Sequence, residues 1–207
     1  MTEVRPAVHV ARGASFLFIQ SFVTSIVGAA GFGIIARLMT KTEMGVYVTL
    51  SLIFALAQIG SSFAFPSAAV KFIAELRGKN DKKGAAGAAF QIFRFTGVAS
   101  ILFGSFVFLF STQICYLLTR TIEYVEVFKI LALDLIFAGV LPSLNGIMIG
   151  LQKMRELAGL NIVAYTISKV LSIAFLLVNL GLWGVILGWL IGDLCGFLLF
   201  SGYILRS

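Results

Sequence analysis

The chain has 207 residues, of which 59% are hydrophobic and 12% are charged. A soluble domain of this size needs far more polar surface, so the composition excludes an ordinary soluble fold. The mean hydropathy is +1.03, and the formal net charge is +7. Because hydrophobic stretches of membrane-spanning length recur, we attribute this charge to membrane orientation and a preference for anionic ligands, and expect no nucleic acid partner.

Six hydrophobic segments are long enough to cross a bilayer, which requires about 20 apolar residues per helix. They cover residues 14–36, 45–70, 88–110, 128–150, 158–180 and 183–205. Pro66 interrupts the second segment near its end. We therefore predict an all-α integral membrane protein in which residues 1–207 form one domain of six transmembrane helices surrounded by membrane lipids.

Lysine and arginine residues outside the spans indicate the orientation, because cytoplasmic loops carry an excess of both. Ten of them lie on the side of the N-terminus and four on the opposite side. The loop at residues 77–84, RGKNDKKG, contributes most. Both termini are therefore predicted to be cytoplasmic, with the chain in the plasma membrane. On the opposite side, residues 111–129 are mixed in polarity and predict a short helix in the membrane interface.

Polar residues of the fifth span fall within about 100° of arc on one side of a helix. They are Asn161, Tyr165, Ser168, Lys169, Ser172 and Asn179. In lipid such a stripe must face protein or water, so it either lines a cavity or bonds to neighbouring helices. The first span has a milder stripe with two interpretations, cavity lining or tight packing through small residues: Gln20, Ser21, Thr24, Gly28 and Gly31.

A row of glycines four residues apart runs along the sixth span, at Gly184, Gly188, Gly192 and Gly196. Glycine at this spacing lets the backbone of another helix approach closely. Close helix packing is therefore the interpretation that we favour for this row. Gly146 and Gly150 of the fourth span show a weaker form of the same pattern.

Two ionisable residues lie near the middle of their spans, where a charge is costly and marks a buried polar site. At about 1.5 Å per residue, Lys169 lies roughly 16 Å and Asp193 roughly 15 Å along its helix. A short turn joins the two spans, so both residues share one level in the bilayer. They either form a purely structural ion pair or act as a switch. In the switch, Asp193 releases Lys169 to an anionic substrate, or takes up a proton or sodium ion.

Arg94 and Asp134 have two interpretations each. If the third helix starts near Ala85, Arg94 lies inside the bilayer, whereas a start near Phe95 leaves it snorkelling at the cytoplasmic surface. Asp134 lies roughly 9 Å from the outer edge of its span. It is either an interfacial residue with no special role or a second acid for ion coupling.

The sequence contains no motif for catalysis or for a cofactor. There is no serine–histidine–aspartate set, no P-loop and no glycine-rich phosphate turn. The chain has one histidine, His9, and its two cysteines, Cys115 and Cys195, are far apart. We therefore expect neither a metal site nor an enzyme, and any transport cannot be driven by ATP bound to this chain.

Two stretches resemble the polysaccharide-export flippases of the multidrug/oligosaccharidyl-lipid/polysaccharide exporter superfamily. The first stretch, residues 34–75, contains three matching motifs: an ARL exit from the first span, an acidic-x-Gly-x-Tyr start to the second span at 43–47, and a PSA stretch running into Lys71. The second stretch, residues 146–199, contains a GLQK turn and a GLWGVILG entry to the sixth span. The resemblance therefore covers essentially the whole chain, through diffuse patterns.

The resemblance implies a flippase that carries oligosaccharides on polyprenyl phosphate or diphosphate from the cytoplasmic to the outer leaflet. The fold would be MATE-like, with two six-helix lobes around a cavity that opens alternately to each side. In that cavity Lys169, together with Arg94, would hold the lipid phosphate, and Asp193 would oppose or gate it. Sugar hydroxyls would be contacted by Gln20, Thr24, Tyr165 and Ser172.

Six spans are half of the twelve or more that these flippases usually have, so the chain is expected to match their N-terminal lobe, with the second lobe absent. It would then be a partial product, pair with a separately encoded second lobe, or form a homodimer. Two other functions stay open. One is a multidrug or cation antiporter that uses Asp193 and Asp134 for ions, although a cationic cavity argues against it. The other is a membrane interaction subunit that transports nothing.

Overall fold

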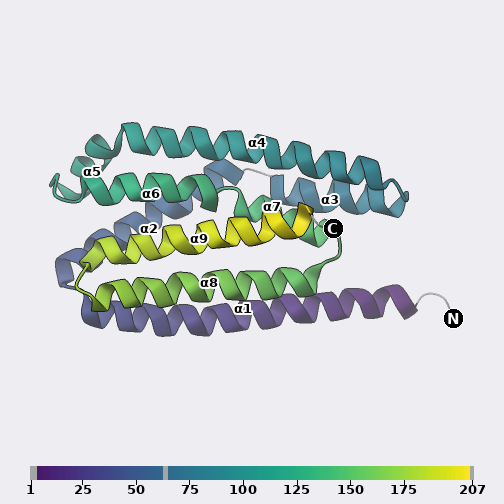
Figure 1. Cartoon of the computed structure of the whole chain (residues 1–207), viewed down its shortest axis with the longest axis horizontal. Coiled ribbons are helices and arrows are strands. Elements are labelled where there is room, and N and C mark those ends of the chain that lie inside the picture. Colours follow the sequence, from purple (N-terminus) through teal and green to yellow (C-terminus); the bar gives the residue numbers. More distant parts are fainter. Residues whose placement is uncertain (1–3, 63–64, 206–207) are drawn as a thin grey trace.

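The structure, a computed structural model, describes residues 4–62 and 65–205, and all regular structure in these ranges is α-helical. Figure 1 shows the helices running roughly parallel to the long axis of the molecule, with the start of α1 and the end of α9 toward the same end of the bundle. The helices are α1 (Val4–Leu38), α2 (Lys41–Ser62), α3 (Phe65–Gly78), α4 (Lys82–Leu109), α5 (Ser111–Thr119), α6 (Val125–Ala138), α7 (Leu141–Gly150), α8 (Met154–Leu177) and α9 (Gly181–Leu205).

Six stretches of this bundle are long and apolar enough to cross a membrane. They are Gly13–Leu38, Lys41–Gly60, Lys82–Leu109, Val125–Gly150, Met154–Leu177 and Gly181–Ile204. In a bilayer the backbone must satisfy its own hydrogen bonds, and uninterrupted helices do so. The prediction of an all-α protein with six membrane-spanning segments is confirmed.

The second span ends earlier than predicted, because the segment 45–70 joins two different helices. α2 ends at Ser62 and α3 begins at Phe65, with Pro66 in its first turn. Proline lacks a backbone N–H and is tolerated in the first turn of a helix, so Pro66 begins a new helix here. α3 buries Ala69 and Ile73 and leaves Lys71 exposed, which makes it an amphipathic helix.

The fourth span is broken in the middle, between α6 and α7. The break lies at Gly139 and Val140, and Pro142 follows in the first turn of α7. This span forms the centre of the bundle: 61% of its apolar stretch is buried, against 11% for the first span. α6 packs against α4 and α9, and α7 packs against α3.

The α8–α9 hairpin is held together by the glycine row of α9. A Cβ added at Gly188 would collide with the Ser172 backbone, and one at Gly192 would collide with the Ser168 backbone. The close packing predicted for this row is confirmed. On its other side α8 packs against α1, so α8 lies between α1 and α9 (Figure 1).

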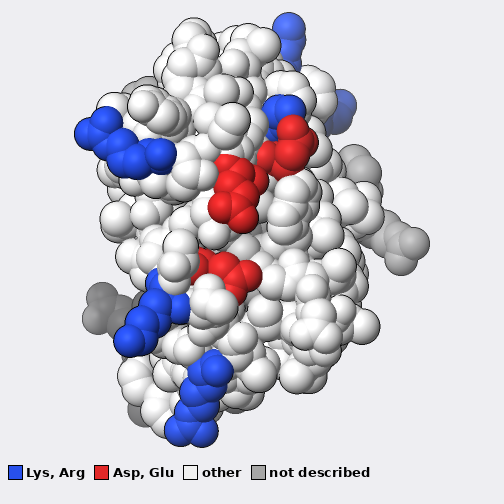
Figure 2. All heavy atoms as spheres, turned by 90° about the vertical axis from the view of Figure 1, so that its left-hand side faces the viewer, with Lys and Arg blue, Asp and Glu red and all other residues white. Residues whose placement is uncertain are grey.

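Charged side chains gather at the two ends of the bundle. At the end away from the chain termini, acidic residues lie near the middle of the face and basic residues lie around them (Figure 2). This end includes Arg37, Lys41, Glu43, Arg120, Glu123, Glu126 and Lys129. The short helix α5, predicted within residues 111–129, also lies at this end.

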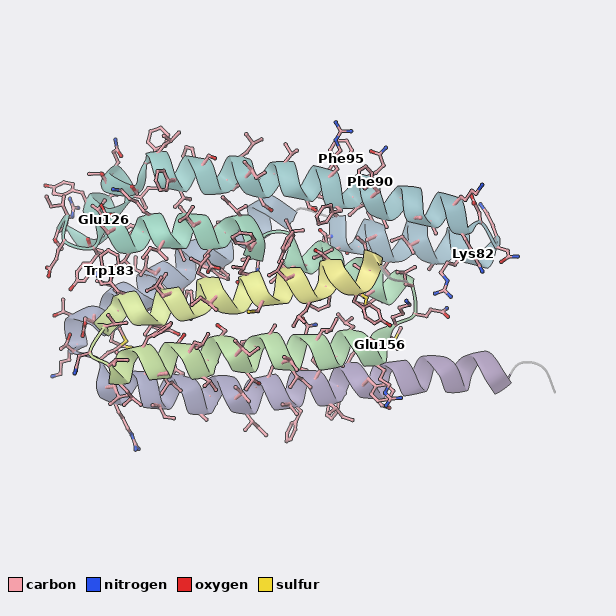
Figure 3. All side chains as sticks on the ribbon, in the orientation of Figure 1. Lys82, Phe90, Phe95, Glu126, Glu156 and Trp183 are labelled. Atoms are coloured by element: carbon pink, nitrogen blue, oxygen red, sulfur yellow. The ribbon has the colours of Figure 1, made fainter. Side chains whose placement is uncertain are left out.

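The sides of the bundle are apolar. Phe90 and Phe95 point outward from α4 in Figure 3, and both are more than half exposed. Lys82 and Glu156 lie toward one end in the same view, and Glu126 and Trp183 toward the other. An apolar belt between two charged ends is the surface that a bilayer requires.

Candidate functional site

A polar groove opens between α1, α7 and α8, with a volume of about 570 Å³. Six of its eight lining residues carry a polar side chain, although the protein is predominantly hydrophobic. Such a groove cannot face lipid without cost, so it must receive water, protein or a ligand. Its lining consists of Gln20, Thr24, Ser25, Gly28, Ala29, Asn145, Asn161 and Tyr165.

Two amide groups of the groove lack a hydrogen-bond donor. The Gln20 Oε1 and Asn145 Oδ1 atoms are buried, and no group in the described part of the chain donates to either. A buried acceptor left without a donor costs about 1–3 kcal/mol. Both atoms are therefore ready to accept a hydrogen bond from a hydroxyl group that enters the groove.

Residues of α1 divide between packing and lining the groove. The Tyr165 hydroxyl group and the Lys169 side chain pack over Gly28 and Gly31, where α1 has no side chain of its own. Thr24 and Gln20 line the groove one and two turns before Gly28, which also belongs to the lining. Both interpretations of the first-span stripe therefore apply.

Lys169 lies one turn of α8 beyond Tyr165, next to the groove but outside its lining. Its Nζ atom is 5.4 Å from the centroid of the Tyr165 ring and 5.7 Å from that of the Trp189 ring. Aromatic faces stabilise a cation at such distances. The Trp189 Nε1–H group is buried without an acceptor. A cation and an orphan donor lie together here, which favours an anionic ligand.

The direct ion pair between Lys169 and Asp193 is absent. Among the side chains that the structure describes, the ion pairs are Lys79–Glu75 and Lys129–Glu126. Asp193 is close enough for its charge to act on Lys169, but no oxygen of it makes an ion pair with the ammonium group. Lys169 is therefore held by aromatic rings and by α1, and its charge stays available.

Asp134 is completely buried among the helices, which favours a role inside the bundle over that of an interfacial residue with no special role. Because α6 begins at Val125, Asp134 lies roughly 14 Å along the helix, at about 1.5 Å per residue. Neither of its carboxyl oxygens has a hydrogen-bond donor. Its carboxyl group faces that of Asp193 across the α6–α9 interface.

Two residues predicted to contact substrate lie elsewhere. Ser172 is fully buried between α8 and α9, and its hydroxyl group lies 2.8 Å from the Ser168 carbonyl oxygen and 3.0 Å from that of Val185. Arg94 is exposed on α4, which packs against α3 and α6 and has no substantial contact with α1 or α8. The structure therefore separates both residues from the groove: Ser172 packs against α9, and Arg94 lies on the exposed side of α4.

Sequence reasoning missed Asn145 and Trp189. Asn145 lies on α7, one turn after Pro142. It lines a groove whose other lining residues come from α1 and α8. An amide in an otherwise very apolar span is a signal that could have found it, since polar groups at that depth serve a purpose. Trp189 shows no such signal, because tryptophan is common in membrane helices.

The profile of the polysaccharide biosynthesis protein family matches residues 34–205, more than four fifths of the chain. The chain belongs to this family. Searches of curated proteins and of solved structures find no match. With its six spans, this member of the polysaccharide biosynthesis family is a multi-pass membrane protein. The family match includes Asn145, Tyr165 and Lys169 and excludes Gln20 and Thr24.

Proposed function

We propose that this protein moves an oligosaccharide linked to polyprenyl phosphate or diphosphate across the plasma membrane. Membership of the polysaccharide biosynthesis family supports the proposal. One observation carries it: within a membrane-spanning helix, a lysine that makes no direct ion pair with a described carboxylate lies beside a polar groove. A lipid-linked sugar has the two matching parts, a hydroxyl-rich headgroup and an anionic phosphate.

Each part of the substrate has a place along the groove. Sugar hydroxyls donate to the orphan oxygens of Gln20 and Asn145 and accept from Tyr165. The phosphate lies toward Lys169 and the Trp189 N–H group, where a charge-assisted contact is strongest. The polyprenyl chain stays in lipid along the exposed apolar face of α1, which includes Phe18, Phe22 and Ile26.

Because α1 packs mainly against α8, the opposite face of α1 is left largely uncovered by the other described helices. A second lobe or a second copy of the chain, docked against α1, would enclose the headgroup and is part of the proposal. A cationic substrate fits less well, since Lys169 would repel it. The antiporter alternative therefore has less support than transport of an anionic lipid.

A charge-specific test replaces Lys169 in the cells that make the protein, with the variant gene in place of the original. Lys169→Met keeps the length of the side chain and removes its charge, whereas Lys169→Arg keeps the charge. We expect loss of surface polysaccharide with Met and retention with Arg, at equal protein levels in the membrane. Lys129→Met, at the charged end of the bundle, is the matched control. Normal surface polysaccharide in Lys169→Met cells would refute the proposal.

A binding test uses the natural fluorescence of Trp189. The protein has two tryptophans, so Trp183→Phe leaves Trp189 as the single reporter. Adding polyprenyl diphosphate to this variant in detergent should change its fluorescence and saturate. A hydrogen bond to a charged group contributes about 1.5–3 kcal/mol, so adding Lys169→Met should weaken binding roughly ten- to hundredfold. Equal affinity with and without Lys169 would count against its role.

A further inference from the structure

We propose that Asp134 of α6 and Asp193 of α9 share one proton and form a proton-binding site inside the bundle. Neither aspartate lines the groove, but the charge of Asp193 acts on Lys169, which lies next to it. Neither of the site's two acids takes part in the proposed contacts to sugar or phosphate.

Burial excludes a charged Asp134 standing alone. The residue is 0% exposed, and neither of its oxygens accepts a hydrogen bond from a donor among the described residues. An ionised carboxylate in such a place is so costly that the group takes up a proton instead. At membrane depth no bulk water is at hand to offset this cost.

The Asp193 carboxylate can accept a hydrogen bond from that proton. Its carboxyl group lies close to that of Asp134, where α6 packs against α9. Two carboxylates have no hydrogen atom between them and repel each other, so they cannot both be ionised at this distance. A single proton turns the repulsion into an O–H···O hydrogen bond, which satisfies one oxygen of each residue.

The balance of charge also favours one proton. Asp134 is faced by Asp193 alone, and Asp193 is faced by Asp134 and by Lys169 of α8, among the charged groups of the described residues. With one proton the acid pair has a charge of −1, which the +1 of Lys169 cancels. The site is neutral only in that state, and neutrality has the lowest cost in hydrocarbon.

A proton fits this pair better than a metal ion does. Within the described ranges no third His, Cys, Asp or Glu side chain joins the pair to form a metal-binding group. Hard cations need several oxygen ligands, typically six or more for Ca²⁺ and Mg²⁺. Two carboxyl groups in a dry interface satisfy a proton fully and a metal ion poorly.

The proton site is linked to the groove through Lys169, and this step rests on the proposed function. A phosphate bound at Lys169 cancels the charge that Asp193 otherwise faces. A second proton on the acid pair then restores neutrality, so that binding of the anion takes up a proton. Affinity should therefore fall as the pH rises, by at most about tenfold per pH unit.

Infrared spectroscopy of the purified full chain in lipid tests the proton directly. Exposed carboxyl groups are ionised at about pH 7, so a protonated carboxyl band there reports a buried acid. We expect the band in the wild-type protein and its loss in Asp134→Asn, where Asp193 can ionise beside Lys169. Asp193→Asn should shift the band, because Asp134 then loses its carboxylate acceptor. Asp81→Asn, at an exposed helix cap, should leave it unchanged.

The overturning results are equally direct. Absence of the band in the wild-type protein, a measurement that needs no variant, would refute the shared proton. So would a band that neither buried variant alters. Loss of the band when sodium replaces choline would assign the site to a metal ion instead. Retained circular dichroism and gel-filtration profiles show that the variants fold.

The pH dependence of binding separates this inference from the function on which its last step rests. Polyprenyl diphosphate affinity, read from Trp189 fluorescence, should weaken with rising pH in the wild-type protein and lose this slope in Asp193→Asn. If affinity does not change with pH while the infrared band is present, the link to the groove is overturned and the proton site is upheld. No binding at any pH would refute the proposed function, while the band would still establish the proton.

Discussion

Residues of one helix face take different roles according to the neighbour that each meets. The polar stripe of α8 is wide enough to reach two helices: Ser168 and Ser172 meet the glycines of α9, whereas Asn161 and Tyr165 line the groove with α1. Their residue types alone do not separate these roles. A hydroxyl group that donates a hydrogen bond to the backbone carbonyl of another helix holds the two helices together. An amide without a partner is available to hydrogen-bond a ligand.

Replacing Ser172 and Asn145 should give opposite patterns. Ser172→Ala removes a buried hydrogen bond and should lower the free energy of unfolding by about 1 kcal/mol without changing affinity for polyprenyl-diphosphate sugars. Asn145→Ala removes an acceptor that has no donor in the protein, so affinity should fall and stability should not. Thermal unfolding and Trp189 fluorescence measure the two quantities. Weaker binding in Ser172→Ala would restore Ser172 to the substrate site.

A methyl group in the α8–α9 contact should be costly. Gly192→Ala places a Cβ against the backbone of Ser168, and overpacking of this kind costs about 1–3 kcal/mol. Gly159→Ala on α8 is the control, because nothing lies within 4 Å of its added Cβ. Thermal unfolding in detergent should show a lower midpoint for the first variant and not for the second. Equal midpoints would contradict the close approach.

Elements outside the spans are held at their ends by specific contacts. In the turn between α3 and α4, the Asp81 side chain accepts a hydrogen bond from the Gly84 N–H group at 2.8 Å and caps α4. The Arg77 guanidinium group donates to the Leu151 carbonyl oxygen, which joins this hairpin to the turn between α7 and α8. The α3–α7 pair is further fixed where Gly146 meets the Pro66 backbone.

Removing the cap of α4 should destabilise this end of the bundle. Asp81→Ala leaves the Gly84 N–H group without its acceptor, which typically costs about 1 kcal/mol. Asp81→Asn should be nearly neutral, because asparagine caps helices as well as aspartate does. Hydrogen exchange at the first turn of α4 should rise in the alanine variant alone. Equal exchange in both variants would show that Asp81 does not act as a cap.

The whole molecule presents an apolar belt with a charged surface at each end. The ten-to-four distribution of basic residues predicts that the end with both termini faces the cytoplasm. The structure places the α3–α4 turn at that end and the α5–α6 turn at the other (Figure 1). Orientation is therefore a property of the bundle as a unit, and one labelled site at each end is enough to test it.

Impermeant maleimide labelling of intact cells should distinguish the two ends. In a background with Cys115 and Cys195 replaced by serine, Glu123→Cys in the α5–α6 turn should react from outside. Lys82→Cys at the start of α4 should react only after the membrane is opened. Both positions are exposed, so access depends on the side of the membrane alone. The reverse pattern would invert the orientation.

The sequence by itself determined the six spans, the close α8–α9 packing and the family resemblance. A bilayer admits few backbone conformations, so long apolar segments must become helices whatever surrounds them. Breaks within the second and fourth spans were less visible, because Pro66 and Pro142 start new helices as readily as they kink old ones.

Only the tertiary structure decided which polar residues meet. It brought Asn145 into the groove, placed Asp134 against Asp193, and turned Ser172 and Arg94 away from the site. The rotation of each helix about its axis and its set of neighbours come from packing among all the helices, which no single segment records. A polar stripe therefore predicts that a helix has an inward face, while the partner of each side chain on that face depends on the assembled bundle.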